Sequence, residues 1–151
     1  PVSATHGSVK RGELYLAWIV SDGPGSGAAV FTPNLVIATP VVVSKQQLRQ
    51  SGGLVRAIAV NSGCANACTG DAGLSAARAM ATTVSKTLDC QLEHALIAST
   101  GVIGLPLDSS KIHQGIVTAA GRLNRTAHTP AAEAIMTTER GPKGTAIHIN
   151  T

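Results

Sequence analysis

Runs of apolar residues predict three buried strands along the chain. Residues 14–20, 54–60 and 95–98 are short and almost continuously apolar, which is typical of strands in the core of a sheet. Ile58 and Val60 share one face of the second strand, because strand side chains point alternately to opposite faces. The third run ends abruptly at two hydroxyl residues and a glycine, so we expect this strand to open into a loop.

Between the first two strands the pattern is less regular. Glycine, serine and proline mark residues 21–27 as a turn, and apolar residues predict further strands at 28–31 and 36–43. Pro40 interrupts the second of these, which favours an edge strand or a bend. Alternation of apolar and polar residues predicts a last strand at 145–149.

Two short helices are predicted from signals at their ends. Ser44 and Gln47 have the spacing of a capping box, and the glycines at 52–53 end the helix that follows from it. A threonine followed by a proline at 129–130 starts the other helix, which runs to about Met136.

Two longer helices have apolar residues at three- and four-residue steps, which form one face of an amphipathic helix. These residues are Leu74, Ala77, Ala81, Val84 and Leu88 in the first helix, and Ile112, Ile116, Ala119 and Leu123 in the second. Asp108 or Ser109 caps the second helix. Strands followed by strand–loop–helix units indicate an α/β layered fold, and since no linker divides residues 1–151 we expect a single domain.

Composition and charge narrow the function classes. Aromatic residues make up only 2% of the 151 residues, so Ala, Val, Ile and Leu must build the core. The net charge of +4 comes from dispersed Lys and Arg without aromatic neighbours, which argues against nucleic-acid binding. No apolar run is long enough to cross a bilayer. The mild positive charge suits small carboxylate substrates and an acidic partner chain equally well.

The three cysteines do not indicate a disulfide framework, because their number is odd and two of them lie in one glycine-rich segment. Cys64 and Cys68 lack the paired spacing of a zinc site, and no local base activates them as nucleophiles. We interpret them as small packing residues, with a catalytic thiol as the alternative. The cysteines favour the cytosol or an organelle matrix, and Pro1 in place of a methionine suggests that the natural N-terminus lies upstream.

Residues 99–104, Ser-Thr-Gly-Val-Ile-Gly, are the first candidate site. Glycine lets the backbone turn sharply and approach a ligand, and a loop between a strand and a helix directs successive N–H groups towards one point. Such amides bind anions, including the oxyanion that develops during acyl transfer. The alternative is a tight turn without a function.

The other candidates are weaker. Residues 137–143 have hydroxyls and charges suited to a polar substrate, but a solvated helix C-terminus explains them as well. The five histidines are scattered, and we expect most of them at the surface. No phosphate-binding or dinucleotide-binding glycine motif is present, so neither a cofactor nor a metal is expected.

Several motifs taken together resemble one family. They are NSGCANACTG at 61–70, STGVIG at 99–104, AIMTTE at 134–139 with Pro142 and Lys143, and AVFT at 29–32 with Asn34. They occur in the order and at the separations typical of the α chain of the ornithine acetyltransferases, the ArgJ family of arginine biosynthesis. Each motif alone is weak, but three in register are specific, and the resemblance covers nearly the whole chain.

The resemblance implies a layered α-β-β-α domain of the ornithine acetyltransferase and DmpA-like class, with helices packed on a mixed sheet. It implies a precursor that cuts itself before a threonine, which becomes the N-terminal nucleophile of a β chain, and the two chains usually form an α2β2 assembly. Acetyl moves from N-acetylornithine to glutamate through an acetyl-threonine, and some members also use acetyl-CoA. The family's oxyanion hole maps to Thr100 and Gly101, and a substrate-binding threonine maps to Thr137.

The chain departs from the family pattern in two ways. The cleavage segment Lys-Gly-x-Gly-Met with the following Ala-Thr-Met-Leu is absent, so we expect the nucleophile outside this chain. Thr151 is not taken as the nucleophile, because the residues around it do not match that segment. Glu139 stands where the family more often has Asp. A non-catalytic module that binds a small anion and a related N-terminal-nucleophile aminopeptidase stay open as alternatives. We expect the cytoplasm of a bacterial or archaeal host, or the mitochondrial matrix or plastid of a eukaryote.

Overall fold

The computed structural model of the chain describes residues 15–145. Its elements are, in chain order, β1 (Tyr15–Ser26), α1 (Thr39–Gln50), β2 (Leu54–Cys64), α2 (Gly70–Thr87), the 3-10 helix η1 (Leu92–His94), β3 (Ala95–Val102), α3 (Ser109–Ala120) and α4 (His128–Ala134). Within these residues the strands form one sheet in the order β1-β2-β3, in which β2 is antiparallel to β1 and parallel to β3. The fold is therefore α/β with a mixed sheet, as predicted.

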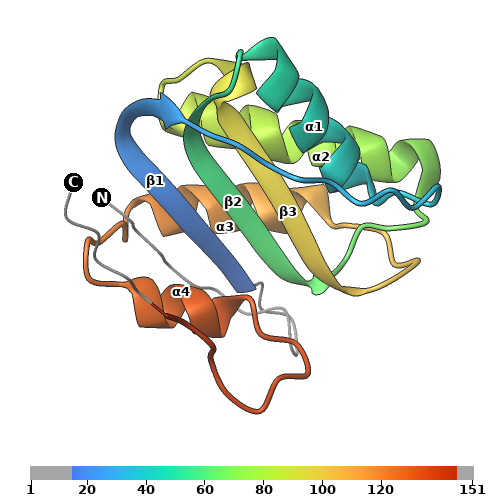
Figure 1. The fold of residues 1–151 in the computed structure, drawn as a ribbon. Coiled ribbons are helices and arrows are strands. Elements are labelled where there is room, and N and C mark those ends of the chain that lie inside the picture. Colours follow the sequence, from blue (N-terminus) through green and yellow to red (C-terminus); the bar gives the residue numbers. More distant parts are fainter. Residues whose placement is uncertain (1–14, 146–151) are drawn as a thin grey trace.

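Helices cover one face of the sheet (Figure 1). α1 and α2 lie behind β3 and β2, and α3 lies beside α2 and packs on β1. Trp18 of β1 is the largest side chain of the resulting core and is fully buried. Its partner on β2 is Ala59, which is small enough to leave room for the indole. The aromatic-poor composition is thus resolved by one tryptophan surrounded by aliphatic side chains.

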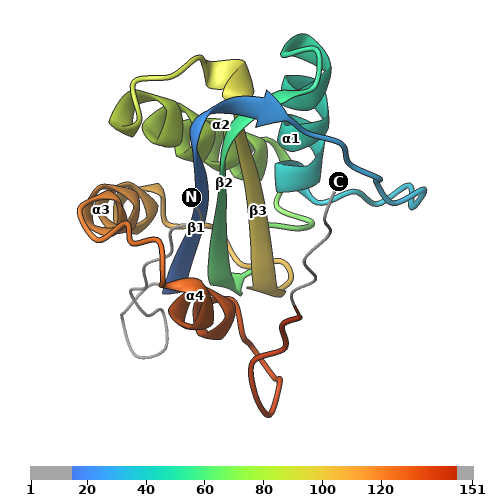
Figure 2. The same cartoon turned by 60° about the vertical axis from the view of Figure 1, so that its left-hand side comes forward.

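The opposite face of the sheet is largely open in the part of the chain that the structure describes. Ile19 is 45% exposed, and Ile58, Val60 and Leu96 on the same face are only partly buried. α4 packs against β1 at the end of the sheet where β2 and β3 stop (Figure 2). The described residues thus form one sheet layer and one main helix layer, and the further two layers that the resemblance implies stay a prediction.

The strand predicted at 36–43 is wrong, because α1 begins at Thr39. Pro40 lies in the first turn of this helix, where a backbone N–H is not needed, so the proline marks a helix start and not a broken strand. The capping box is also wrong, since no side chain caps α1. Ser44 instead accepts a hydrogen bond from the N–H of Ile97 and donates one to its C=O, which joins α1 to β3.

The remaining segment before α1 also differs from the prediction. Residues 28–31 contain no strand, and the stretch from 27 to 38 runs without a helix or strand to the start of α1. The turn predicted at 21–27 falls within β1, which continues to Ser26 through a register shift between Val20 and Gly25. Proline and glycine therefore bend this strand without ending it.

The other predicted elements are confirmed with changed ends. β2 continues to Cys64 and β3 to Val102, both past the predicted limits. Asp108 caps α3, as predicted, because its side chain accepts hydrogen bonds from the N–H groups of Ser110 and Lys111. The strand predicted at 145–149 lies outside the described residues except for Thr145. No helix in the described range is long and apolar enough to span a membrane.

Candidate active site

The candidate residues lie where the two parallel strands end side by side. The last pairs in the register of β2 and β3 are Ser62 with Thr100, Gly63 with Gly101, and Cys64 with Val102. In α/β folds, ligands bind at the carboxyl ends of parallel strands. The glycine-rich segments 61–70 and 99–104, which the sequence singled out separately, therefore meet at one edge of the sheet.

Gly101 is a point of very close approach between the two strands. Its φ of 131° is one that only glycine adopts readily. A Cβ added there would lie 2.3 Å from the carbonyl carbon of Gly63 and 2.7 Å from the nitrogen of Cys64. Both the backbone angle and the lack of space therefore require glycine at this position.

From the bonds of its neighbours along β3, we infer that the backbone N–H of Gly101 faces away from β2. Ile97 turns its N–H and C=O away from β2 towards Ser44, whereas the C=O of Val102 accepts from the N–H of Ala65, which follows β2. Backbone direction alternates along a strand, so residues 97, 99 and 101 face outward. Since β3 is the edge strand of the described sheet, its ladder does not use the Gly101 N–H.

This arrangement corrects the expectation of a loop with successive converging amides. Residues 99–102 belong to β3, and the N–H of Gly104 donates to the carbonyl oxygen of Ala67 at 2.9 Å. By the same alternation, the N–H groups of Ser99 and Gly101 face outward, and the Thr100 hydroxyl is a further donor at this edge. That hydroxyl is partly buried and has no hydrogen-bond partner among residues 15–145. The site is a strand edge with a small number of donors.

Ser62 connects the segment of Thr137, the third predicted site residue, to the same end of the sheet. Its buried hydroxyl donates a 2.6 Å hydrogen bond to the carbonyl oxygen of Ala134, the last residue of α4. Thr137 follows three residues later and is partly buried. The turn that carries Thr137 is therefore anchored next to the Ser62–Thr100 pair. The structure thus brings Thr100, Gly101 and the Thr137 segment to one end of the fold.

Glu139 shapes the turn at Thr137. One carboxylate oxygen accepts the N–H of Thr137 at 2.7 Å and the N–H of Thr138 at 3.1 Å. These bonds, above all the one from Thr137, lower the pKa of Glu139 below its usual value, and the charge of Lys143 adds to the effect. The carboxylate is exposed to solvent and ionised at neutral pH. The turn is therefore stabilised by these two hydrogen bonds and not by burial.

A buried asparagine that sequence reasoning did not select organises the 61–70 segment. The side chain of Asn66 donates to the C=O of Gly73 and accepts from the hydroxyl of Thr69, while its own C=O accepts from the N–H and hydroxyl of Thr39. Asn66 thereby joins the starts of α1 and α2. Its φ of 48° is a value that asparagine tolerates better than most residues. An asparagine inside a glycine-rich segment was the available signal.

The cysteines follow the packing interpretation only in part. Cys64 is buried in the core, as predicted, with its thiol donating to the C=O of Leu105, but Cys68 is exposed, so the packing interpretation is wrong for it. Burial raises the pKa of the Cys90 thiol, although the positive charge of Arg56 opposes this. Within residues 15–145 no group of three or more His, Cys, Asp or Glu side chains is arranged to hold a metal ion.

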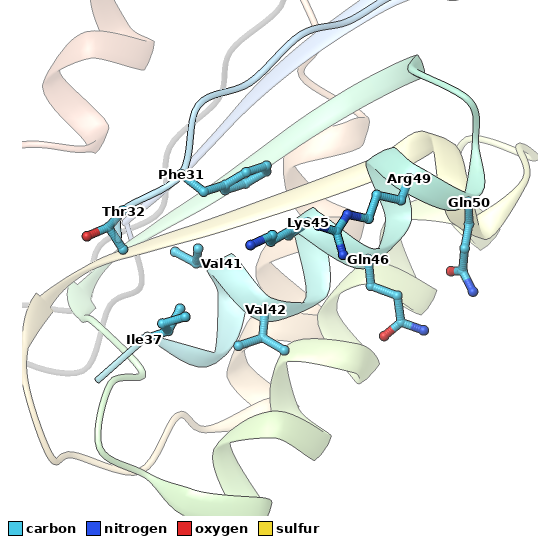
Figure 3. Close-up of a pocket in the computed structure, with 9 residues that line it drawn as sticks. All are labelled: Phe31, Thr32, Ile37, Val41, Val42, Lys45, Gln46, Arg49 and Gln50. Carbon is cyan, nitrogen blue, oxygen red and sulfur yellow. The ribbon is translucent and has the colours of Figure 1, made fainter. Parts of the chain in front are cut away.

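Neither the described histidines nor a cavity beside α1 involves residues of the strand ends. His113 and His128 are exposed, as expected, but His94 is buried in η1. A cavity of about 450 Å³ lies between residues 31–37 and the outer side of α1, where Lys45 extends beneath the Phe31 ring at 5.9 Å from its centroid (Figure 3). None of the residues that line it belongs to β2, β3 or α4.

The fold and the site together define a class: an α/β domain whose parallel strands end side by side in glycine and hydroxyl residues, an arrangement suited to binding an anion. Comparison with known proteins identifies the family. A family profile described as "ArgJ family" matches residues 1–151. The chain belongs to the ArgJ family.

Individual relatives agree with this assignment. The chain is 43% identical over 137 residues to the arginine biosynthesis bifunctional protein ArgJ of Thermotoga neapolitana, which covers 91% of this chain and 34% of that protein. Identity to the protein of the same name from Geobacter sulfurreducens is 42%, over 93% of this chain and 36% of that protein. The chain thus spans about a third of the length of the curated relatives that it matches.

Two crystal structures share the fold. The ArgJ protein of Bacillus halodurans superposes with a TM-score of 0.81 at 35% identity, covering 92% of this chain and 74% of that chain. Ornithine acetyltransferase of Mycobacterium tuberculosis, determined in complex with ornithine, superposes with a TM-score of 0.76 at 36% identity, covering 83% and 68%.

Proposed function

We propose that this chain is the α subunit of an acetyltransferase that moves acetyl from N-acetylornithine to glutamate. In this proposal the chain supplies the oxyanion hole, from the N–H of Gly101 and from Thr100, and Thr137 contacts the substrate. The nucleophile is the N-terminal threonine of a β chain, which is cut from the same precursor and stays associated with the α chain, as in an α2β2 assembly. Acetyl-CoA is a second acetyl donor to be tested, and no other cofactor is needed.

The chemistry takes place in two balanced steps. The threonine Oγ of the β chain attacks the acetyl carbonyl of N-acetylornithine, the amide C–N bond breaks, and ornithine leaves with the hydroxyl proton, carried by the threonine's own α-amine. The α-amine of glutamate then attacks the acetyl-threonine ester and restores the free hydroxyl. In each step negative charge develops on the carbonyl oxygen, and hydrogen bonds from Gly101 and Thr100 stabilise it.

The observation that carries this proposal is the close approach of Gly101 to the Gly63–Cys64 peptide at the end of β3, the edge strand of the described sheet, where only glycine fits. From the alternation of backbone direction along β3 we infer that the Gly101 N–H faces away from β2. A fixed backbone donor needs no reorganisation when the charge develops, which makes it more effective than a mobile side chain. The Mycobacterium tuberculosis relative, crystallised with ornithine, supports a substrate of that chemistry.

Two further observations support a partner chain. The open sheet face has apolar side chains at Ile19, Ile58 and Leu96 that another layer would cover. This chain covers 74% of the crystallised Bacillus chain but only 34% of the Thermotoga protein. The crystallised Bacillus chain is therefore much shorter than the full Thermotoga sequence. A precursor divided into two chains accounts for this difference.

The experiment is intact-mass analysis of the full-length protein that contains this chain, with N-terminal sequencing of every polypeptide found. We expect two polypeptides, one of which begins with threonine and gains the mass of one acetyl group on incubation with N-acetylornithine. Addition of glutamate then removes the acetyl group and yields N-acetylglutamate. Acetyl-CoA in place of N-acetylornithine tests the second donor.

Two outcomes would replace the proposal. A single uncut polypeptide that binds small carboxylates without acetyl transfer would indicate the anion-binding module. Two polypeptides that hydrolyse small peptide amides but do not transfer acetyl would indicate the aminopeptidase. Localisation follows from the host: the matched relatives include bacterial proteins and a protein named as mitochondrial from Heterostelium pallidum, so we expect the cytoplasm or the mitochondrial matrix.

A further inference from the structure

A buried side-chain bridge joins the two strand ends directly behind Gly101. Asn61 of β2 is fully buried, and its amide oxygen accepts a 2.5 Å hydrogen bond from the hydroxyl of Ser99 on β3. Its amide nitrogen donates a 2.9 Å hydrogen bond to the carbonyl oxygen of Cys64. One asparagine therefore holds both strands at once, on the face of the sheet that the helices cover.

The two groups that Asn61 holds lie on either side of Gly101. Ser99 is two residues before Gly101 on β3. The peptide between Gly63 and Cys64 is the backbone that lies against Gly101, because a Cβ at Gly101 would meet its atoms. The bond to the Cys64 carbonyl also holds the chain just after Gly63, whose φ is 98°. A shift of either end of the bridge would therefore turn the Gly101 peptide.

We propose that Asn61 and Ser99 are positioning residues that fix the direction of the Gly101 N–H. This inference rests on the proposed function, since it gives these residues a role in the acyl-transfer step. Neither side chain contacts the substrate; both act through the backbone of Gly101. An oxyanion donor must be held closely in place, because a displacement of about 1 Å costs on the order of a hundredfold in rate.

The chain offers a matched control for a purely structural role. Ser44 also forms buried hydrogen bonds to β3, to the N–H and C=O of Ile97 at 2.8 Å and 2.6 Å. Ile97 lies four residues before Gly101. The bonds from Ser44 reach only Ile97 and not the Gly63–Cys64 peptide. Ser44→Ala and Ser99→Ala therefore each remove one hydroxyl bonded at β3, the first on α1 with its partner at Ile97 and the second on β3 with its partner at Asn61, nearer to the site.

The first experiment measures kcat, KM for N-acetylornithine and Tm in the full-length protein with Ser99→Ala, Ser99→Thr or Ser44→Ala. We expect Ser99→Ala to lower kcat about tenfold to a hundredfold, with KM nearly unchanged, because the donor acts mainly on the transition state. Ser99→Thr keeps a hydroxyl and should recover most of the rate. Ser44→Ala should lower Tm and leave kcat within about twofold of the unsubstituted protein, since its bonds do not act on Gly101.

The second experiment uses Asn61→Asp, which is nearly isosteric. Burial raises the pKa of a carboxyl group at this position. Below that pKa the protonated Asp donates to the Cys64 carbonyl as Asn61 does, and above it the ionised Asp repels that carbonyl. The variant should therefore show a kcat that falls as pH rises through a new transition, one that the unsubstituted protein lacks.

The outcomes separate this inference from the proposed function. If the unsubstituted protein transfers no acetyl, the proposed function is wrong and the positioning role with it. If it is active and Ser99→Ala keeps its kcat, or Ser44→Ala loses as much kcat as Ser99→Ala does, the positioning role alone is wrong. If Ser99→Ala lowers Tm without changing kcat, the bridge only stabilises the fold.

Discussion

Gly101 occupies a position at this edge of the sheet that no larger residue fits. Its backbone angle and the closeness of the Gly63 carbonyl both exclude a side chain, and its N–H leaves the ladder because the strand alternates. Thr100 beside it keeps a hydroxyl without a partner among the described residues. The two neighbours thus contribute donors of different kinds, one rigid and one rotatable.

Replacement of Gly101 by alanine is the sharpest residue-scale test. We expect Gly101→Ala in the full-length protein to lower kcat for acetyl transfer about a hundredfold to a thousandfold, the usual cost of losing one oxyanion donor. Gly52→Ala is the control, because Gly52 also has a positive φ, of 63°, but has no atom within 4 Å of an added Cβ. It should cost some stability and no activity. Activity of Gly101→Ala within a few-fold of the unsubstituted protein would refute the oxyanion assignment.

Glu139 gives a pH-dependent prediction at the same scale. Because hydrogen bonding lowers its pKa, the bonds to Thr137 and Thr138 are present at neutral pH and are lost as pH falls through that lowered value. We expect the amide resonances of Thr137 and Thr138 to shift together in strongly acidic solution, and Glu139→Gln to abolish that transition. If the two amides titrate in the Glu139→Gln variant as well, another group is responsible.

At the scale of elements, the 61–70 segment is the connection on which the site depends. It joins the end of β2 to the start of α2 and, through Asn66, to the start of α1. Neither helix has a side-chain cap of its own at the start. For α1, the acceptor that sequence reasoning sought in a local capping residue is instead the backbone carbonyl of Asn66, which accepts the N–H of Thr39. At α2 the Asn66 side chain donates to the Gly73 carbonyl and so joins the segment to the helix without capping it.

Removal of the Asn66 side chain should be costly. Asn66→Ala leaves the Gly73 carbonyl without that donor and places alanine at a φ of 48°, so we expect the free energy of unfolding to fall by about 2–3 kcal/mol. Asn124→Ala is the matched control, since Asn124 is exposed and only accepts bonds within its own turn; it should cost less than about 0.5 kcal/mol. Denaturant unfolding measures both, and equal losses would contradict the assigned role of Asn66.

At the scale of the whole molecule, a hydrogen bond from Ser62 joins β2 to the end of α4. Asn61 and Ser62 are adjacent, so their side chains point to opposite faces of β2. The Asn61 side chain bonds to Ser99 of β3, and the Ser62 hydroxyl bonds to the last residue of α4. Two adjacent residues of β2 therefore bond to β3 and to the end of α4. Among the described elements, only α4 lies at the end of the open apolar face of the sheet.

Loss of the Ser62 hydroxyl should loosen α4 selectively. In Ser62→Ala we expect hydrogen exchange at residues 128–137 to become about tenfold faster, because one buried hydrogen bond holds the end of this short helix. Ser85→Ala is the control, since Ser85 is also buried but bonds within α2. Exchange that rises equally everywhere in the chain, or not at all in α4, would contradict a selective role for Ser62.

The sequence by itself determined what depends on neighbouring residues. Periodicity identified the strands around Trp18, Ile58 and Ile97 and the amphipathic helices α2 and α3, and the motif order led to the family. Glycine at 101 could be singled out because few residues tolerate its conformation.

Tertiary structure decided what depends on residues far apart in the chain. The valines before Ser44 became helix because packing outweighs their β-propensity, and β3 extended to Val102 because β2 supplied a parallel partner. The bond between Ser99 and Asn61 and the bond between Ser62 and Ala134 join residues 38 and 72 positions apart. No local pattern encodes such contacts, since their free energy appears only when the sheet has formed.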